Sequence, residues 1–294
     1  MVVPRAARSF RGGPLLVVSA LLFAVMALAA KEASRAMSGT QVAFVRSLMG
    51  LAACAGYHVF VRRLVARNRL GLLVRGATGA LAVYAYFLAI EHLPVGIATL
   101  LNYTSPIFTA FWSVLLFRQR IHARAYAALL LTTVGLAAVI RGQAPAGAFG
   151  LGIWELTGLT ASLFSGLSMV FIAELRKTDG AWEIFATFSL ACALVSAPQA
   201  LAHWTWPAGA AWRPLAVMGV ASVAAQVVMT YAMREVSATV AGIVNQLTPV
   251  ASLTFGWLLF DERFGRLTAA GIVFTLAGGS IGATLAAWRD PRRG

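Results

Sequence analysis

Residues 101–120 read LNYTSPIFTAFWSVLLFRQR, and residues 244–263 read VNQLTPVASLTFGWLLFDER. At a constant offset of 143 positions, both stretches contain Asn-x-x-x-Pro and, nine residues after the proline, Leu-Leu-Phe-x-x-Arg. Matches of alanine or leucine are common by chance in apolar sequence, but this combination of asparagine, proline and arginine is not. The pattern therefore indicates an internal duplication.

The duplication extends beyond these two stretches. Residues 89–140 align with residues 232–283 without a gap. Weaker matches at the same offset join the first apolar segment of each half, namely Ser19, Met26 and Ala30 with Ser162, Met169 and Ala173. We therefore divide the chain into a first repeat, residues 1–143, and a second repeat, residues 144–294.

The composition is that of a membrane protein. Of the 294 residues, 60% are hydrophobic and 12% are charged, with a mean hydropathy of +0.78, whereas soluble proteins have about 45–50% apolar and about 25% charged residues. A helix that crosses the hydrocarbon core needs about 20 mostly apolar residues. Cutting at charges, glycine and proline gives ten such segments, at about 13–30, 39–61, 72–91, 94–117, 124–140, 151–173, 182–202, 214–233, 236–260 and 267–288.

Each repeat contains five of the ten segments. Because five is odd, the second repeat enters the membrane in the opposite direction to the first, as in the inverted repeats of many transporters. The sequence thus predicts an all-α membrane protein with ten transmembrane helices in two inverted five-helix repeats. A duplicated bundle without a transport role is the alternative interpretation.

The net charge of +14 is interpreted as a signal of membrane topology. With the N-terminus inside, 17 Lys and Arg residues, Arg75 among them, fall in cytoplasmic stretches and six fall outside. Cytoplasmic loops collect basic residues, so we expect both termini in the cytoplasm and no binding of nucleic acid. The first segment, which follows Arg5, Arg8 and Arg11, also fits a secretory signal, but its match to the second repeat favours a retained span.

The two copies of the motif resemble the signature of the EamA-like family in the drug/metabolite transporter superfamily, and within it most of all the YddG-type amino acid exporters. Arg46 in the second segment and the following Gly135 or Gly278 also match that pattern. The resemblance covers essentially the whole chain and implies ten helices in two inverted halves around a central cavity. Gln119 departs from it, because the family usually has glutamate there, as Glu262 does in the second copy.

The two Asn-x-x-x-Pro turns are the first candidates for a substrate site. Each proline lacks an N–H and crowds the carbonyl four residues earlier, which belongs to Asn102 before Pro106 and to Asn245 before Pro249. Polar groups freed in this way are expensive in contact with lipid. We therefore expect both turns to face the protein interior near the bilayer midplane, with the two prolines as hinges. The alternative is that they are packing kinks whose amides bond to local carbonyls.

Other candidates are polar or aromatic side chains at middle depth, namely Tyr84, Tyr103, Gln226 and Gln246. Each of them has ordinary helix packing as an equally good interpretation. Arg46 is the one charge assigned to the interior of a span, where a charge is expensive and a functional candidate by default. It can receive a substrate carboxylate, or it can extend toward the interface or bond to carbonyls of a neighbouring helix.

All ten carboxylates lie in expected loops or within about a turn of a segment end. A deep carboxylate that couples transport to protons or sodium is therefore not predicted. The four histidines are scattered and Cys54 and Cys192 lack metal spacing, so no metal, cofactor or catalytic residue is expected. A membrane-embedded enzyme and a channel remain alternatives of other classes.

The leading prediction is a multi-pass transporter of a bacterial-type inner membrane that exports small neutral or zwitterionic metabolites, most of all aromatic or other apolar amino acids, by alternating access. The alternative within transport is a multidrug, nucleotide-sugar or phosphate-ester carrier. The expected partners are a small-molecule solute and the lipid bilayer. The oligomeric state is left open, and a monomer is compatible with the sequence.

Overall fold

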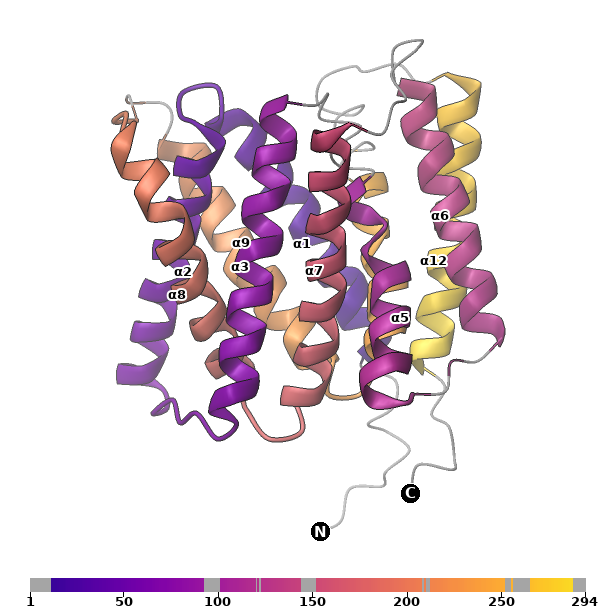
Figure 1. Cartoon of the computed structure of the whole chain (residues 1–294), viewed down its shortest axis with the longest axis horizontal. Helices are drawn as coiled ribbons and strands as arrows, with labels where there is room; N and C mark the ends of the chain where they lie inside the picture. The colour runs from indigo at the N-terminus through magenta and orange to yellow at the C-terminus, as the bar shows by residue number, and fades with distance from the viewer. Residues whose placement is uncertain are drawn as a thin grey trace.

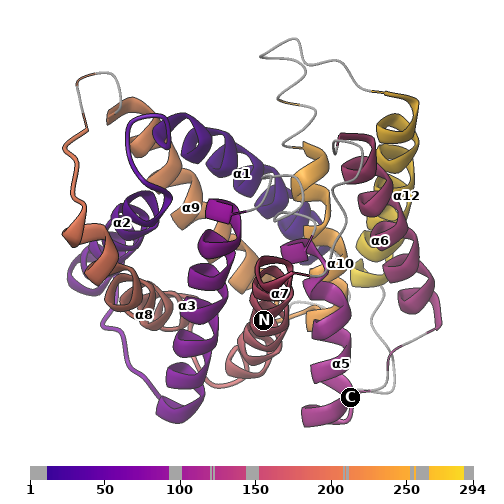
Figure 2. The same ribbon diagram turned by 45° about the horizontal axis from the view of Figure 1, so that its top comes forward.

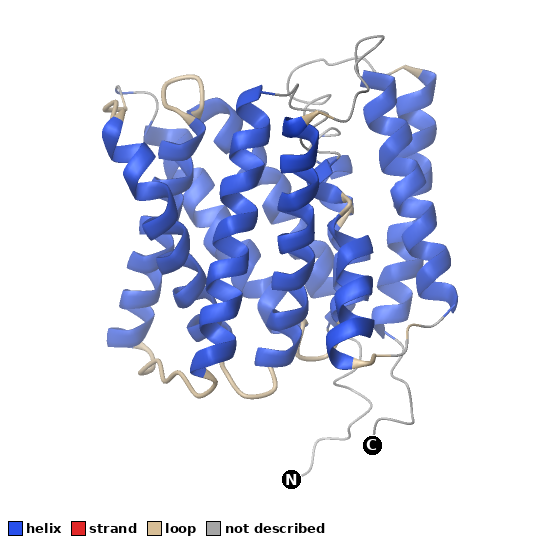
Figure 3. Cartoon of the chain, viewed as in Figure 1, coloured by secondary structure: helices blue, strands red, loops and turns tan. Residues whose placement is uncertain are grey.

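In a computed structural model, the structure describes residues 12–92, 101–119, 121, 123–143, 152–207, 209, 212–251, 255 and 265–287. Within these residues the secondary structure is helical and no strand occurs (Figure 3). The helices are α1 (Gly12–Ala33), α2 (Gly39–Phe60), α3 (Arg69–His92), α5 (Ser105–Phe117), α6 (Ala123–Gln143), α7 (Ile153–Leu175), α8 (Ala181–Ala202), α9 (Trp212–Ala232), α10 (Ala238–Asn245) and α12 (Arg266–Ala287). The predicted all-α class is confirmed.

The helix bounds follow the ten predicted segments closely where they can be compared. In the described part of the chain, five helices are long and apolar enough to cross a membrane, namely α1, α2, α7, α8 and α9. The fourth and ninth segments are described only in part, as α5 and α10 with a few neighbouring residues. The expected boundary between the repeats borders residues 144–151, which lie outside the described residues.

The packing of the helices is symmetric: the same main helix pairs result when the two repeats are exchanged. By the offset of 143, α7, α8, α9 and α12 correspond to α1, α2, α3 and α6. Two pairs join corresponding helices, α2 with α8 and α6 with α12. Two further pairs, α1 with α9 and α3 with α7, are converted into each other when the halves are exchanged. Figures 1 and 2 both show α6 and α12 side by side at one edge of the bundle.

The α6–α12 pair shows the same symmetry at atomic scale. A Cβ atom placed on Gly135 would lie 2.6 Å from Thr275 Oγ1, and one placed on Gly278 would lie 2.5 Å from Thr132 Cγ2. Gly135 corresponds to Gly278 and Thr132 to Thr275, so each glycine receives the threonine of the opposite repeat. These small residues allow the two backbones to approach closely, as is common between membrane helices.

Small side chains also fill the interior elsewhere. Ala20 and Ala24 of α1 are completely buried, and α1 packs along α9. Large apolar side chains such as Leu130 and Leu194 are instead 67% exposed. In water such exposure would be costly, but it suits helices whose outer faces contact lipid.

Candidate functional site

Both proline motifs lie where a helix is interrupted. Helical residues 101–103 end at a turn at Thr104, and α5 begins at Ser105 with Pro106 in its first turn. The Thr104 side chain donates to the Leu101 carbonyl at 2.6 Å and to Ser162 Oγ of α7 at 3.0 Å. In the second repeat α10 ends at Asn245, a turn follows at Gln246, and helix resumes at Leu247. At the offset of 143, Thr104 corresponds to Leu247, so the two helix breaks lie within one position of each other in the two repeats.

The two interrupted helices are joined directly. The Gln246 side-chain amide donates from Nε2 to the Tyr103 backbone carbonyl at 3.1 Å, and a Cβ atom on Gly242 would lie 3.3 Å from Pro106 Cβ. Gln246 is completely buried, and its Oε1 atom has no hydrogen-bond partner among the described residues. The crossing of α5 and α10 thus contains a buried acceptor that is free to bind a donor.

The two motif asparagines make local contacts. Ser165 of α7 donates to Asn102 Oδ1 at 3.4 Å, and Thr248 donates to Asn245 Oδ1 at 3.4 Å. Both asparagines are half-buried, whereas Pro106 and Pro249 are buried. We call Asn102, Tyr103, Pro106, Asn245, Gln246 and Pro249 the crossover cluster.

Arg46 lies on the other side of the bundle, on α2. Its Nε atom donates to Ser222 Oγ of α9 at 2.5 Å, and its guanidinium carbon is 5.8 Å from the ring centroid of Phe188 on α8. Arg46 is the eighth residue of α2, about 10 Å along the helix axis at a rise of about 1.5 Å per residue. The sequence assignment of Arg46 to the interior of a span agrees with this position.

Arg75 is a correction to the sequence analysis, which counted it with the cytoplasmic stretches. It is the seventh residue of α3 and is only 3% exposed. Its guanidinium carbon is 4.3 Å from the same Phe188 ring centroid, and its Nε and Nη1 atoms have no hydrogen-bond partner in the described part of the chain. A signal was present in the sequence, because Arg75 falls inside the predicted segment 72–91.

Arg75, which is buried, and Arg46, which is half-buried, therefore form a pair of like charges. With distances of 5.8 and 4.3 Å to one ring centroid, the two guanidinium carbons are at most about 10 Å apart. At an effective dielectric constant of about 20, their repulsion is about 1.7 kcal/mol or more. The ion pairs seen among the described residues, Arg35–Glu32 and Lys177–Glu174, involve neither of them. The Phe188 ring stabilises both cations but does not neutralise them.

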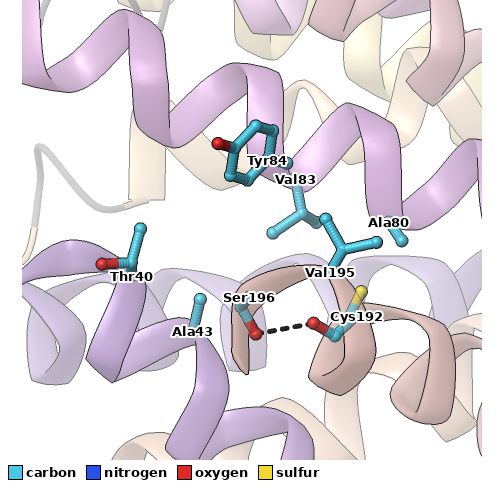
Figure 4. Close-up of a pocket in the computed structure, with 8 residues that line it drawn as sticks. All are labelled: Thr40, Ala43, Ala80, Val83, Tyr84, Cys192, Val195 and Ser196. Atoms are coloured by element: carbon cyan, nitrogen blue, oxygen red, sulfur yellow. Dashed lines mark hydrogen bonds between the residues drawn. The ribbon is translucent and has the colours of Figure 1, made fainter. Parts of the chain in front are cut away.

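A small pocket lies about one helical turn from this pair, between α2, α3 and α8 (Figure 4). Its wall includes Ala43, which precedes Arg46 by three residues, and Cys192, which follows Phe188 by four. Tyr84 contributes its ring, and the other lining residues are Thr40, Ala80, Val83, Val195 and Ser196. The wall is mostly apolar, with hydroxyl groups toward the start of α2 and the end of α8.

Gln226 belongs to this side of the bundle. It lies on α9 one turn after Ser222, which receives the Arg46 hydrogen bond, so both residues share a helix face. Gln226 is 4% exposed, and its Nε2 atom lacks a partner among the described residues. The predicted site residues thus separate into the crossover cluster and an arginine cluster, which we define as Arg46, Arg75, Phe188, Ser222 and Gln226.

Polar contacts that involve the linkers connect the helices at both ends of the bundle. On the lower side of Figure 1, Asp179 in the α7–α8 linker accepts from the backbone N–H of Arg67 at 2.8 Å and of Asn68 at 3.2 Å. On the upper side, Gln41 at the start of α2 and Thr205 after α8 exchange two hydrogen bonds, of 3.1 and 2.9 Å. We call these the Asp179 latch and the Gln41–Thr205 latch.

The described carboxylates lie at the helix ends and in linkers. Glu32 and Glu174 are in the last turns of α1 and α7, Glu155 and Glu183 are in the first turns of α7 and α8, and Glu235 follows α9. This agrees with the positions expected from sequence. Within the described residues, no group of His, Cys, Asp or Glu side chains is placed to hold a metal ion.

Comparison with known proteins adds to this picture. The sequence profile of the EamA-like transporter family matches residues 10–141 and again residues 152–281. The Pseudopaline exporter CntI of Pseudomonas aeruginosa (strain UCBPP-PA14) is 31% identical over 261 residues, which cover 87% of this chain and 90% of the relative. Solute carrier family 35 member E4 of Homo sapiens is 26% identical, with 78% of this chain and 67% of the relative covered. A solved crystal structure at 20% identity has the same fold, with a TM-score of 0.80 over 94% of this chain and 97% of that chain.

Proposed function

The chain belongs to the EamA-like transporter family, and we propose that it exports small amino-acid-like metabolites, neutral or zwitterionic, by alternating access. It is a membrane transporter and not an enzyme. The substrate class, the direction of transport and the location in a bacterial inner membrane are part of the proposal.

The relationship to an exporter is the observation that carries this proposal. The Pseudopaline exporter matches nearly the whole length of this chain at 31% identity. This supports export as the direction of transport. Its substrate is not assumed for this protein. We also propose that residues 1–143 and 144–294 act as the two inverted units that rock against each other.

The geometry supports alternating access. Two interrupted helices cross inside the bundle, and discontinuous helices at the repeat interface are typical of transporter sites. The Asp179 latch and the Gln41–Thr205 latch tie opposite ends of the same bundle. A path bounded by one polar contact at each end can open on one side while it stays closed on the other.

The charge distribution supports an orientation. The linker from 61 to 68 contains Arg62, Arg63 and Arg67, and the α7–α8 linker begins with Arg176 and Lys177. Because both linkers lie on the lower side of Figure 1, the positive-inside rule places that side in the cytoplasm. The Asp179 latch is then the inner contact and the Gln41–Thr205 latch the outer one.

A second candidate function is transport of phosphate esters. The observation in its favour is that the buried Arg75 adds a second cation to the half-buried Arg46, and anionic solutes need such groups. A test that includes both solute classes separates the two functions.

The experiment is efflux from proteoliposomes that contain the purified protein. Vesicles are loaded with labelled phenylalanine, leucine, alanine or glucose 6-phosphate, and loss of label is followed with and without a proton gradient. We expect faster loss of at least one amino acid than from protein-free vesicles, and no effect on the phosphate ester. Loss of the phosphate ester alone would replace the proposal with the second candidate, and loss of neither from a folded sample would refute the substrate class.

A further inference from the structure

The arginine cluster contains a charge that the rest of the described protein does not neutralise. Only 3% of Arg75 is exposed. Its Nε and Nη1 atoms have no acceptor among the described residues. A guanidinium carries five N–H donors and remains charged in proteins. Buried polar groups without partners are rare and costly, so Arg75 points to a missing acceptor.

The Arg46 side chain also extends toward Phe188, but from a helix that starts at the opposite end of the bundle from α3. α2 and α3 run in opposite directions, and the two arginines lie seven and six residues after their respective helix starts. Both guanidinium groups converge on Phe188. Arg46 donates its Nε–H to Ser222 Oγ, and this hydrogen bond orients the guanidinium group. The two terminal nitrogens of Arg46 are then available to donate to an anion. Two such groups within about 10 Å suit one anion placed between them.

The packing of the Arg75 guanidinium against Phe188 requires a residue without a side chain at position 79. A Cβ atom on Gly79 would overlap Arg75 Nη1 and would lie 2.8 Å from Phe188 Cδ2. Glycine one turn after Arg75 therefore lets the guanidinium fold back against α3 and the ring. The adjacent pocket wall begins at the next residue, Ala80.

We propose that Arg46 and Arg75 together bind the carboxylate of the transported solute between their guanidinium groups. This inference rests on the proposed function for the identity of the solute. The proposed amino-acid-like solute supplies the carboxylate. The adjacent pocket has a volume of about 10 Å³, enough for about one water molecule, so the site is proposed for the carboxylate alone.

The test uses anion binding to the purified full-length protein, so that it does not depend on knowing the solute. Benzoate, benzamide, phenyl phosphate and chloride are titrated against the wild type and the variants Arg46→Gln, Arg75→Gln and Arg75→Lys, and the affinity is measured by calorimetry. Arg69→Gln is the matched control, because Arg69 is an exposed arginine on the same helix. Arg75→Lys keeps the charge if neutralisation prevents folding.

We expect benzoate to bind the wild type and Arg69→Gln equally, benzamide not to bind, and affinity for benzoate to fall at least tenfold in both glutamine variants. Arg75→Lys should retain weaker but measurable binding. Equal benzoate affinity in all variants would overturn the inference, as would no binding to the wild type, or tighter binding of phenyl phosphate or chloride than of benzoate. Because these outcomes are independent of efflux, failure of this site is distinguishable from failure of the proposed amino acid substrate.

Discussion

Gln246 donates its side-chain amide to the backbone carbonyl of Tyr103, and these two residues occupy equivalent positions in the two repeats. The hydrogen bond therefore lies where the interrupted helix of one half meets that of the other. Because each helix is broken there, the contact replaces hydrogen bonds that a continuous helix would make within itself. This contact joins the two halves at the place where the proposed alternating access requires movement.

Loss of this contact should weaken the crossover. Gln246→Leu removes the donor, and a typical buried hydrogen bond contributes about 1 kcal/mol, so we expect a lower unfolding temperature and slower efflux. Thr157→Val is the control, because it removes a hydroxyl that donates, in an exposed hydrogen bond, only to the Ile153 carbonyl of its own helix, α7. Thermal unfolding of both purified variants measures the difference. An equal loss of stability in Thr157→Val and Gln246→Leu would contradict the role of the amide.

Gly79→Ala should displace Arg75 from Phe188 without removing any charge. The added methyl group would overlap Arg75 and the ring, and overpacking of this kind costs about 1–3 kcal/mol. We expect weaker benzoate affinity together with a moderate loss of stability. Gly56→Ala is the matched control, because a Cβ atom there meets nothing within 4 Å. Benzoate affinity in Gly79→Ala that equals that of Gly56→Ala would show that the space beside Arg75 does not matter.

The reciprocal packing of α6 and α12 predicts equal effects from equivalent substitutions. Gly135→Ala and Gly278→Ala each force a methyl group toward the threonine of the opposite repeat. We expect the two variants to lower the unfolding temperature by similar amounts, and each by clearly more than Gly56→Ala. Thermal unfolding in one detergent checks this. A large loss in only one variant would argue against a symmetric α6–α12 contact.

The two latches should control access to Cys192, which lines the pocket and is buried as a free thiol. In a Cys54→Ala background, Thr205→Val weakens the Gln41–Thr205 latch and Asp179→Asn weakens the Asp179 latch. We expect Thr205→Val to speed labelling of Cys192 by an impermeant thiol reagent from outside, and Asp179→Asn to speed it from the cytoplasmic side.

Labelling rates in sealed vesicles of known orientation provide this measurement. The same background without a latch substitution is the control, and Ser34→Ala, an exposed position in the α1–α2 linker outside both latches, tests for general loosening. If both latch variants accelerated labelling from the same side, the assignment of the latches to opposite gates would be wrong.

The sequence was sufficient to predict most of the fold because the duplicated motif is unusual and the apolar segments are long. The reciprocal pairs Gly135–Thr275 and Gly278–Thr132 are the structural consequence of that duplication. The crossing at Tyr103 and Gln246 was predicted only as two separate polar positions. Which backbone carbonyl receives the Gln246 amide depends on how two distant helices approach, and periodicity carries no such information.

The arginine cluster was predicted less well. Arg46 was recognised because it lies deep in an apolar segment, but Arg75 was counted as a loop charge because several arginines precede it in the sequence. Arg69 is exposed because it is the first residue of α3. Arg75 is buried because it lies on the side of α3 that packs against Phe188 of α8. Phe188, Ser222 and Gly79 carry no sequence signal of their own and gain their roles through packing.

The most direct test of transport by alternating access is counterflow. Proteoliposomes are preloaded with unlabelled phenylalanine and diluted into a trace of labelled phenylalanine, with the wild type and with an Asn102→Leu, Asn245→Leu double variant. We predict transient accumulation of label above equilibrium in the wild type and none in the folded double variant. Label that only equilibrates in the wild type, without an overshoot, would contradict a carrier and indicate a channel.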